Sequence, residues 1–305
     1  MPLTIDALKP IFWSMREPAW RKRKLRSLKR RLLRRWEGEF SIKREYKAFF
    51  GKKLSLANPQ TFSEKIFHRK IMANRHGNAM FTRLADKYLV RDYVRETIGE
   101  EYLVDLIWHG DDPNDIPFES LLSKCIVKTN HGSGGNIILQ DPIDRDHVAK
   151  TLRGWLKENY YWVGHEYWYY KIRPRIVVEP FLDDGHSDGP LDYRFWCFGG
   201  RPEIIQVDNH SHSINPFYGP GWNKLPVSYR DNAIECDIPE PANLSEMLLV
   251  ASKLSSSFDF VRVDLFNVNG KIYFGELTFT PAAGLLKFKP ESWDTLLGQK
   301  WVKTA

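Results

Sequence analysis

Charged and apolar residues alternate in two segments near the carboxyl end of this sequence. Val261-Arg262-Val263-Asp264 carries an arginine and a carboxylate, and Gly275-Glu276-Leu277-Thr278 carries a carboxylate and a hydroxyl. Successive side chains of a strand point to opposite faces, so the polar residues of each segment share a face if both segments are strands. Magnesium takes one or two carboxylates together with phosphate oxygens. The pattern therefore predicts a metal site formed by Asp264 and Glu276, with the Thr278 hydroxyl beside them.

The turn between these strands decides whether the two carboxylates lie together. A two-residue turn at Asn269-Gly270 would pair Val263 with Glu276 and send the carboxylates to opposite faces. A three-residue turn, with Gly270 in the left-handed region, would pair Arg262 with Glu276 and keep the polar side chains on one face. The predicted metal site therefore requires the three-residue turn.

A second region combines a lysine with a glycine-rich loop. Ile126 and Val127 precede Lys128 in an apolar run that predicts a strand, and the loop His131-Gly132-Ser133-Gly134-Gly135-Asn136 follows. Glycines let backbone N–H groups approach phosphate oxygens, and a neighbouring lysine reaches the same phosphates. Together with the carboxylates, this region predicts an enzyme that uses ATP. The imidazole of His131 is expected to meet phosphate as well.

A third segment, residues 175–181, resembles an edge strand that could offer backbone groups to an adenine, with Phe181 as an apolar cover. The alternative interpretation is that this segment is simply a buried strand. His210, His212 and Trp222 lie in a loop after a strand and could contact a substrate, or simply form a polar loop.

Composition limits the possible partners. The chain has 305 residues, of which 42% are apolar, enough for a substantial core. Ten of its 45 basic residues lie within residues 21–35, so the rest of the chain is slightly acidic, which argues against nucleic acid as a partner. Three widely spaced cysteines argue against a disulfide framework and a zinc site. They predict that the protein is located in a reducing cytoplasm. We expect no signal peptide and no membrane-spanning segment.

Residues 20–40 predict a basic amphipathic helix. Its apolar residues recur at three- and four-residue spacing and form one stripe: Leu25, Leu28, Leu32 and Trp36. Such a helix favours docking on an anionic membrane surface, which would place the protein peripherally on the inner face of the cytoplasmic membrane. Packing of the stripe on the body or on a partner subunit is one alternative, and nucleic-acid contact is another.

The remaining segments mix helices and strands without strict alternation, which predicts an α+β fold with a cleft between lobes. Thr61 or Ser63 is expected to cap a helix, with Glu64 in its first turn. Further helices are expected over residues 86–94, 147–159 and 243–256. Strands are expected over 102–108, 125–129, 175–181 and 193–198, and in two segments of 260–277.

In their order, these motifs resemble those of ATP-grasp enzymes, most specifically the TupA-like branch of teichuronopeptide biosynthesis. The resemblance covers about residues 55–290. It rests on residues 58–66 and 84–91, on Gly275-Glu276-Leu277-Thr278-Phe279 and on Pro281-Ala282-Ala283-Gly284. It implies an ATP-grasp domain over 55–295, with nucleotide bound between two α+β lobes and a lid lobe over about 125–181. Residues 1–54 would be the basic N-terminal segment and 296–305 a tail.

The resemblance also implies a role for each motif. Lys87 and Lys128 would bind phosphates, residues 131–136 would form the phosphate loop, and the adenine hinge would consist of Glu179, Pro180 and Phe181. Asp264 and Glu276 would hold magnesium, and Arg262 would stabilise the reacting acyl group.

One further motif matches the family's sequence pattern, and one residue departs from it. Asp192-Tyr193-Arg194 matches the Asp-x-Arg motif of tubulin tyrosine ligase-like members, which implies that Asp192 and Arg194 join the nucleotide site. Thr278 departs from the pattern, because the family usually places an asparagine metal ligand there.

The implied reaction is activation of a carboxylate by ATP, followed by attack of an amine to give an amide and ADP. The expected partners are a free amino acid or amine and a sugar acid in a polysaccharide or lipid-linked glycan of the cell surface. The aromatic segment 160–170 could stack on sugar rings, and its alternative role is packing within the lid. Two other functions stay open. One is a kinase of this fold that acts on a sugar hydroxyl, and the other is a glycosyltransferase with Asp183-Asp184 as its metal motif.

Overall fold

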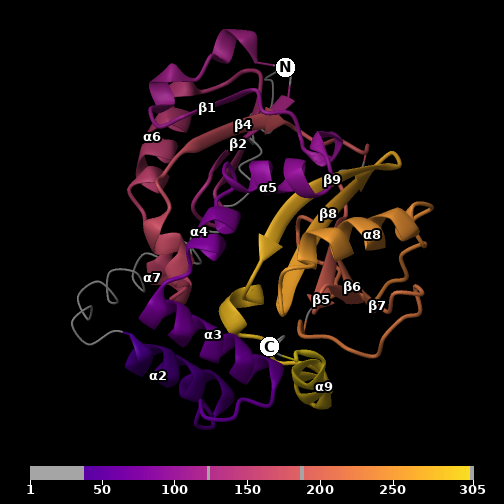
Figure 1. The fold of residues 1–305 in the computed structure, drawn as a ribbon. Helices are drawn as coiled ribbons and strands as arrows, with labels where there is room; N and C mark the ends of the chain where they lie inside the picture. Colours follow the sequence, from indigo (N-terminus) through magenta and orange to yellow (C-terminus); the bar gives the residue numbers. More distant parts are fainter. Residues whose placement is uncertain (1–37, 122–123, 186–188, 232, 303–305) are drawn as a thin grey trace, which may run out of the picture.

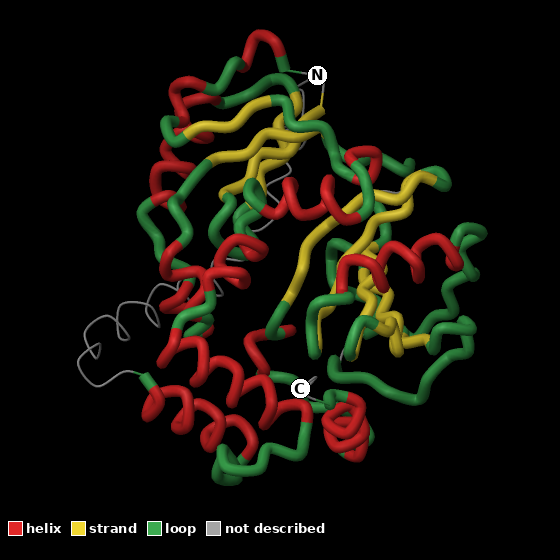
Figure 2. The backbone as a smooth tube through the Cα atoms, in the orientation of Figure 1, coloured by secondary structure: helices red, strands yellow, loops and turns green. Residues whose placement is uncertain are grey.

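The computed structural model of the protein describes residues 38–121, 124–185, 189–231 and 233–302. Two antiparallel sheets, one of four strands and one of five, are surrounded by helices (Figure 1). Figure 2 shows the strands as two groups, with helices mostly at the outside. The stripe of Leu25, Leu28, Leu32 and Trp36 lies outside the described residues.

The first helices of the described chain pack around one buried helix, α3 (Phe62–His76). Thr61 caps it: its hydroxyl accepts from the N–H of Glu64, whose carboxylate accepts from the N–H of Thr61. This confirms the predicted helix start. α2 (Glu39–Phe50) and α9 (Ser292–Lys300) pack on α3, and Leu297 and Trp301 join its core. The core therefore extends beyond residue 295, where a tail was expected.

The four-stranded sheet has the order β1-β4-β2-β3. Its strands are β1 (Trp108–Gly110), β2 (Lys124–Thr129), β3 (Asn136–Gln140) and β4 (Ile176–Pro180). Helix α6 (Arg145–Leu156) packs against it through Val148 and Leu152. The strand expected over 102–108 is wrong for all but its last residue, because Leu103 and Val104 are buried by packing and not by strand pairing.

Apart from α6, the helical segments between α3 and β5 in the sequence are short. They are α4 (Ala79–Ala85), α5 (Val90–Thr97), α7 (Tyr161–Gly164), and the 3-10 turns η2 (Glu100–Tyr102), η3 (Pro113–Asp115), η4 (Phe118–Ser120) and η5 (Tyr167–Lys171). Trp168, Tyr161 and Trp162 are buried in ring contacts around α7 and η5. For these three residues, the structure supports packing, the alternative role of the aromatic segment.

The five-stranded sheet has the order β7-β6-β5-β8-β9. Its strands are β5 (Asp192–Phe198), β6 (Arg201–Asp208), β7 (Phe217–Tyr218), β8 (Phe260–Val268) and β9 (Lys271–Thr278). Helix α8 (Leu244–Ser255) covers one face, where alternate residues such as Phe195, Val207 and Val263 form the main core. This face is mostly apolar, with Asn267 hydrogen-bonded to Asn243 near one end.

The opposite face of the same sheet is divided. At one end Trp196, Phe198 and Phe260 pack against Phe62 of α3. At the other end the side chains are charged. The turn η6 (Pro281–Gly284) follows β9 and leads back to α3, where Gly284 lies close to Ile66 and Phe67. The fold therefore brings a polar half-face beside the first helices.

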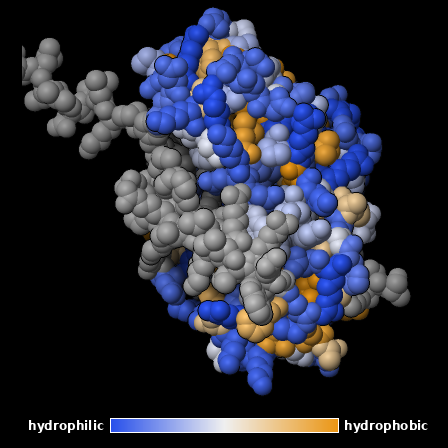
Figure 3. All heavy atoms as spheres, turned by 90° about the vertical axis from the view of Figure 1, so that its left-hand side faces the viewer, coloured by the Kyte–Doolittle hydropathy of each residue, from blue (hydrophilic) through white to orange (hydrophobic). Residues whose placement is uncertain are grey.

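None of the helices in the described part of the chain combines the length and the apolar composition that a membrane span requires. Figure 3 shows one side of the molecule, where hydrophilic side chains prevail and hydrophobic ones gather in small patches.

Candidate active site

The hairpin of β8 and β9 sets which side chains share the polar face. Its turn has two residues, Asn269 and Gly270, both with positive φ, so that Val268 pairs with Lys271. The expected three-residue turn is therefore wrong. A bulge corrects the register instead: Leu265 pairs with Phe274, and Asp264 pairs with Glu276, which leaves Gly275 as the extra residue.

Glycine is required at this bulge, because a Cβ on Gly275 would lie 2.9 Å from the carbonyl oxygen of Asp264. The bulge returns the carboxylates to one face. Arg262 donates from Nε to Asp264 Oδ1 over 2.7 Å and from Nη2 to Thr278 Oγ1 over 3.1 Å. Its Nη2 also lies 3.3 Å from Glu276 Oε1, which accepts from the Thr278 hydroxyl. The predicted grouping is present, although the predicted turn is not.

The four side chains fit a magnesium ion in their chemistry. The Arg262 guanidinium lies between the Asp264 and Glu276 carboxylates, so the site already stabilises positive charge there. Burial raises the pKa of Asp264 to about 7 although Arg262 opposes the shift. Burial would also raise the pKa of Glu276, but the charges of Arg262 and Lys87 lower it. Asp264 and Glu276 are the residues that would hold the ion, with phosphate oxygens and water completing its shell.

Arg194 and Asp192 extend the polar face onto β5. Glu276, Asp264 and Arg194 are directly paired across β9, β8 and β5, so they form one row. Arg194 donates from Nε to Asp192 Oδ2 over 2.7 Å, and the same nitrogen lies 3.8 Å from Asp264 Oδ2. Burial raises the pKa of Asp192. The predicted Asp-x-Arg motif is therefore continuous with the carboxylate pair.

Lys87 links this face to the glycine loop. Its Nζ donates to the carbonyl of Gly132, and its side chain lines the same small cavity as Glu276 and Tyr169. Burial lowers the pKa of Lys87. The loop itself connects β2 with β3, and a Cβ on Gly132 would lie 3.0 Å from the Tyr160 ring, so a larger residue is disfavoured at that position. The predicted phosphate loop and carboxylates therefore lie beside one lysine.

Lys128 and the predicted hinge meet at Glu179. Lys128 Nζ lies 2.5 Å from Glu179 Oε2, and Arg91 Nη1 lies 3.2 Å from Glu179 Oε1. The edge strand expected at the hinge is wrong, because β4 lies between β1 and β2. Phe181 donates its backbone N–H to the carbonyl of Lys124 in β2, and because backbone groups alternate along a strand, those of Glu179 also face β2. Of these three residues, only Pro180 directs its carbonyl to the other side, where β4 extends past the end of β1.

The expectation for His131 is wrong. Its side chain is buried, with Nδ1 3.2 Å from Asn130 Oδ1 and Nε2 3.0 Å from the carbonyl of Glu158. Burial lowers the pKa of His131, which disfavours the charged form of the ring. Both ring nitrogens contact the protein and not the loop's outer side, so the histidine anchors the loop to the segment after α6.

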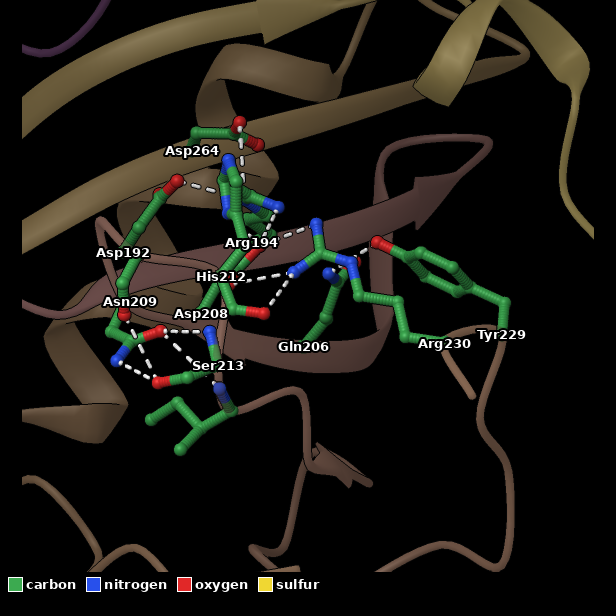
Figure 4. Close-up of polar contacts among 12 residues, drawn as sticks. Asp192, Arg194, Gln206, Asp208, Asn209, His212, Ser213, Tyr229, Arg230 and Asp264 are labelled. Atoms are coloured by element: carbon green, nitrogen blue, oxygen red, sulfur yellow. Dashed lines mark hydrogen bonds and ion pairs between the residues drawn. The ribbon is translucent and has the colours of Figure 1, made fainter. Parts of the chain in front are cut away.

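Sequence reasoning missed a polar cluster at the end of β6, centred on Asp208 (Figure 4). This carboxylate is fully buried and contacts Arg194, Arg230 and His212. Burial would raise the pKa of Asp208, but the His212 hydrogen bond and both arginines lower it. Alternation along Ile205-Gln206-Val207-Asp208 was a usable signal for the strand. Arg230, in a distant loop, had none.

The other candidates have structural contacts. Trp222 stacks on Tyr218 with ring centroids 4.4 Å apart and donates to the carbonyl of Ile238. Asp183 pairs with Lys124 at an exposed position. The two residues are thus engaged away from the row of Glu276, Asp264 and Arg194.

Several solved structures resemble this chain. D-alanine–D-alanine ligase from Bacillus anthracis, complexed with ATP, is 18% identical over 65% of this chain and 55% of its own, with a TM-score of 0.40. The corresponding ligase from Helicobacter pylori is 16% identical over 73% and 60%, with a TM-score of 0.41. Phosphoribosylamine–glycine ligase from Thermotoga maritima is 12% identical over 67% and 51%, with a TM-score of 0.40.

The chain thus spans little more than half the length of these proteins. No curated protein matches it. The family model of TupA-like ATP-grasp proteins matches residues 64–302, which is most of the sequence. The predicted family and the predicted α+β ATP-grasp fold are therefore confirmed, and the chain belongs to the TupA-like ATP-grasp family.

Proposed function

We propose that this protein is an ATP- and magnesium-dependent ligase that joins a carboxylate to an amine and releases ADP and phosphate. The observation that carries the proposal is the placement of Lys87, which contacts the glycine loop at Gly132 and shares a cavity with Glu276. The groups that we propose to bind phosphate and metal therefore lie side by side. Family membership and the ligase activity named for the similar solved structures support the same class.

The chain's own residues would divide the work. Lys87 and Lys128 would bind the ATP phosphates together with the backbone of the glycine loop. Glu179 holds Lys128 in place, and the Pro180 carbonyl offers an acceptor to the base. Arg194 and Arg262 would stabilise charge on the transferred phosphoryl and on the acyl oxygen. Magnesium, when bound, would neutralise charge on the phosphates.

The proposed reaction has two balanced steps. A carboxylate oxygen attacks the γ-phosphorus, the bond from that phosphorus to the β-phosphate oxygen breaks, and ADP leaves. The amine nitrogen then attacks the acyl carbon, phosphate leaves with the oxygen, and the nitrogen loses a proton. Every covalent bond forms between substrates, so this scheme needs no nucleophile from the protein.

We further propose that the acid is a sugar acid of a cell-surface polysaccharide or lipid-linked glycan, and that the amine is an amino acid or a simpler amine. The segment 20–40 would dock the enzyme on the inner face of the cytoplasmic membrane, because it carries all of the chain's excess positive charge. These substrates and this location follow from the family resemblance and the sequence pattern.

The test is ADP release from Mg-ATP with the full-length protein, measured across a panel of amino acids and amines with and without uronic acids. We expect ADP release to require both an amine and an acid, and mass spectrometry to find the amide. ADP release that needs a sugar but no amine, with a phosphorylated product, would support the kinase instead. Transfer of a sugar from a nucleotide sugar without ATP would support the glycosyltransferase.

A further inference from the structure

The Asp208 cluster holds more positive groups than one buried carboxylate needs. A buried carboxylate requires a counter-charge, which one guanidinium supplies. Arg230 Nη1 lies 3.0 Å from Asp208 Oδ1 and Arg230 Nη2 lies 3.0 Å from Oδ2, while Arg194 and the Nδ1 atom of His212 contact the same carboxylate. Arg194 is nearly buried, whereas the side chains of Arg230 and His212 are 25% and 55% exposed.

The surrounding loop fixes these exposed groups. His212 has a φ of 58°, a left-handed conformation that is uncommon for histidine. Asn209 stabilises the turn, because its side chain accepts from the N–H of Ser213 over 2.9 Å. Tyr229 is tied to β6 by a 2.6 Å hydrogen bond from Gln206, and the adjacent Arg230 lies over its ring. Arg230 and His212 are therefore held in place before a ligand arrives (Figure 4).

An unused acceptor lies beside these cations. Oδ1 of Asp192 is buried and has no hydrogen-bond partner among the described residues, although Oδ2 accepts from Arg194. Asp192 and Asp208 are directly paired across β5 and β6, which places their Cβ atoms ~5 Å apart. The cluster thus presents Asp192 Oδ1 as an acceptor for a donor group. Beside it, at the paired position of Asp208, the Arg230 guanidinium and the His212 imidazole could bind an anion.

These groups complement an α-amino acid, in which an ammonium and a carboxylate are joined through one carbon. We propose that Asp192, Arg230 and His212 bind the amine substrate, an α-amino acid whose ammonium donates to Asp192 and whose carboxylate is bound by Arg230 with His212. The inference rests on the proposed ligase function and narrows it, because a simple amine would leave Arg230 and His212 without a ligand. Arg194 and Asp208 are positioning residues.

The location agrees with the proposed chemistry. Arg194 connects Asp192 and Asp208 to Asp264, so the cluster adjoins the row where the acyl phosphate would form. An ammonium at Asp192 would lie on the side of the cluster nearest that row, and the carboxylate at Arg230 would lie on the far side. The amine would thereby point towards the acyl carbon.

The experiment measures KM for three substrates in the full-length enzyme: ATP, the acid and the best amino acid of the panel. It also uses an amine analogue that lacks the carboxylate. Arg230→Gln should raise KM for the amino acid at least tenfold, leave KM for ATP and acid within twofold, and change turnover of the analogue far less than turnover of the amino acid. His212→Asn should act in the same direction with a smaller effect. Asp192→Asn should weaken use of the amino acid and of the analogue alike.

Arg201→Gln is the matched control, because Arg201 lies at the other end of β6 with its side chain 80% exposed. It should change none of these values. Thermal melting confirms that each variant is folded, and His212→Asn tests the proposal if Arg230→Gln does not fold. The inference is overturned if Arg230→Gln affects the analogue as much as the amino acid, or if the changes fall on ATP or the acid. It is also overturned if Asp192→Asn mainly weakens Mg-ATP, since Asp192 would then be a metal or phosphate ligand.

Direct binding separates this inference from the proposed function. Amino-acid binding to the enzyme with Mg-ADP, measured by calorimetry, requires no turnover. If no amide forms but an amino acid binds and Arg230→Gln weakens it at least tenfold, the ligase proposal fails and the binding site stands. If amides form from amines regardless of a carboxylate, the ligase proposal stands and the amino-acid site fails.

Discussion

The two faces of the five-stranded sheet are built from the same strands and have opposite character. On β5, Tyr193, Phe195 and Cys197 point into the core under α8, while Asp192 and Arg194 point to the other side. On β8, Val263 is buried in that core and its neighbours Arg262 and Asp264 pair with each other. One face therefore provides stability, and the polar half of the other carries the groups that we propose for chemistry.

The two faces differ in how burial of their side chains is stabilised. Apolar side chains gain from leaving water, whereas the charged ones are stabilised in the interior by opposite charges in direct contact. Asp264 contacts Arg262, and Asp208 contacts Arg194 and Arg230. The polar half-face is thus a network of ion pairs, in which removing one charge changes how its neighbours are compensated.

The largest effect is expected on the apolar face. Phe195→Ala removes a fully buried ring and should lower the free energy of unfolding by about 3–5 kcal/mol, because a cavity remains. Urea denaturation measures it. Thr278→Ala, on the polar face, should cost about 1 kcal/mol, since it removes hydrogen bonds to Arg262 and Glu276. Equal losses in both variants would contradict the distinction between the faces.

Arg262→Ala should separate chemistry from binding. We expect kcat/KM to fall about 100-fold, or about 3 kcal/mol, while ATP affinity changes little, because this arginine would act on the transition state. The variant should also unfold more readily at pH 8 than at pH 6, since Asp264 loses its counter-charge and becomes neutral only at lower pH. Adding Asp264→Asn should restore stability but not activity. An equal loss of ATP affinity would make Arg262 a nucleotide ligand.

Glu166 gives a second test of how a buried carboxylate is compensated. Its hydrogen bond comes from a hydroxyl, that of Thr280. Burial raises the pKa of Glu166 from 4.5 to about 7. The folded protein therefore holds this proton more tightly than the unfolded chain, and stability falls as pH rises from about 4.5 through 7.

Glu166→Gln removes this pH-dependent penalty. It should stabilise the protein at pH 8 by up to about 3 kcal/mol relative to wild type, with a smaller gain at pH 6. Thermal melting at both values measures the difference. A gain that is the same at both pH values would show that Glu166 is not the titrating group.

The bulge at Gly275 tests what aligns the polar face. Gly275→Ala should cost about 1–3 kcal/mol and abolish activity, because its Cβ would press on the Asp264 carbonyl and disturb the pairing with Glu276. Gly270→Ala is the matched control in the same hairpin. Its Cβ would meet nothing, so only its positive φ costs about 1 kcal/mol. Full activity in Gly275→Ala would show that the bulge does not set the site.

Sequence reasoning reached the parts of the site that depend on local pattern. Alternation around Asp264 and around Lys128 identified two strands and the faces of their side chains, and Thr61 identified a helix start. It failed at the hairpin register, because a bulge is favoured by packing on both faces and not by the turn residues alone. Nor could it see that His131 turns inward, since Glu158 approaches only in the folded chain.

Strand β6 shows an intermediate case. The alternation of Ile205 and Val207 with Gln206 and Asp208 separates the two faces of the strand, but a bulge beside Trp196 shifts its register with β5, so counting from the Gly199-Gly200 turn would have put Asp208 on the wrong face. The partner Arg230 comes from a loop whose path no periodic pattern specifies, so the cluster as a whole required the structure. Local pattern predicts a face, and loop packing decides which charges meet on it.

The central claim is that the polar half-face and the glycine loop together bind Mg-ATP. Calorimetric titration of Mg-ATP into wild type, Lys87→Ala and Lys128→Ala tests it most directly. Each lost cation should weaken binding about tenfold or more. Lys271→Ala, a lysine at the turn end of β9 that lies over Tyr273, should bind as wild type does. Unchanged affinity in both site variants, or no binding by the folded wild-type protein, would contradict the account.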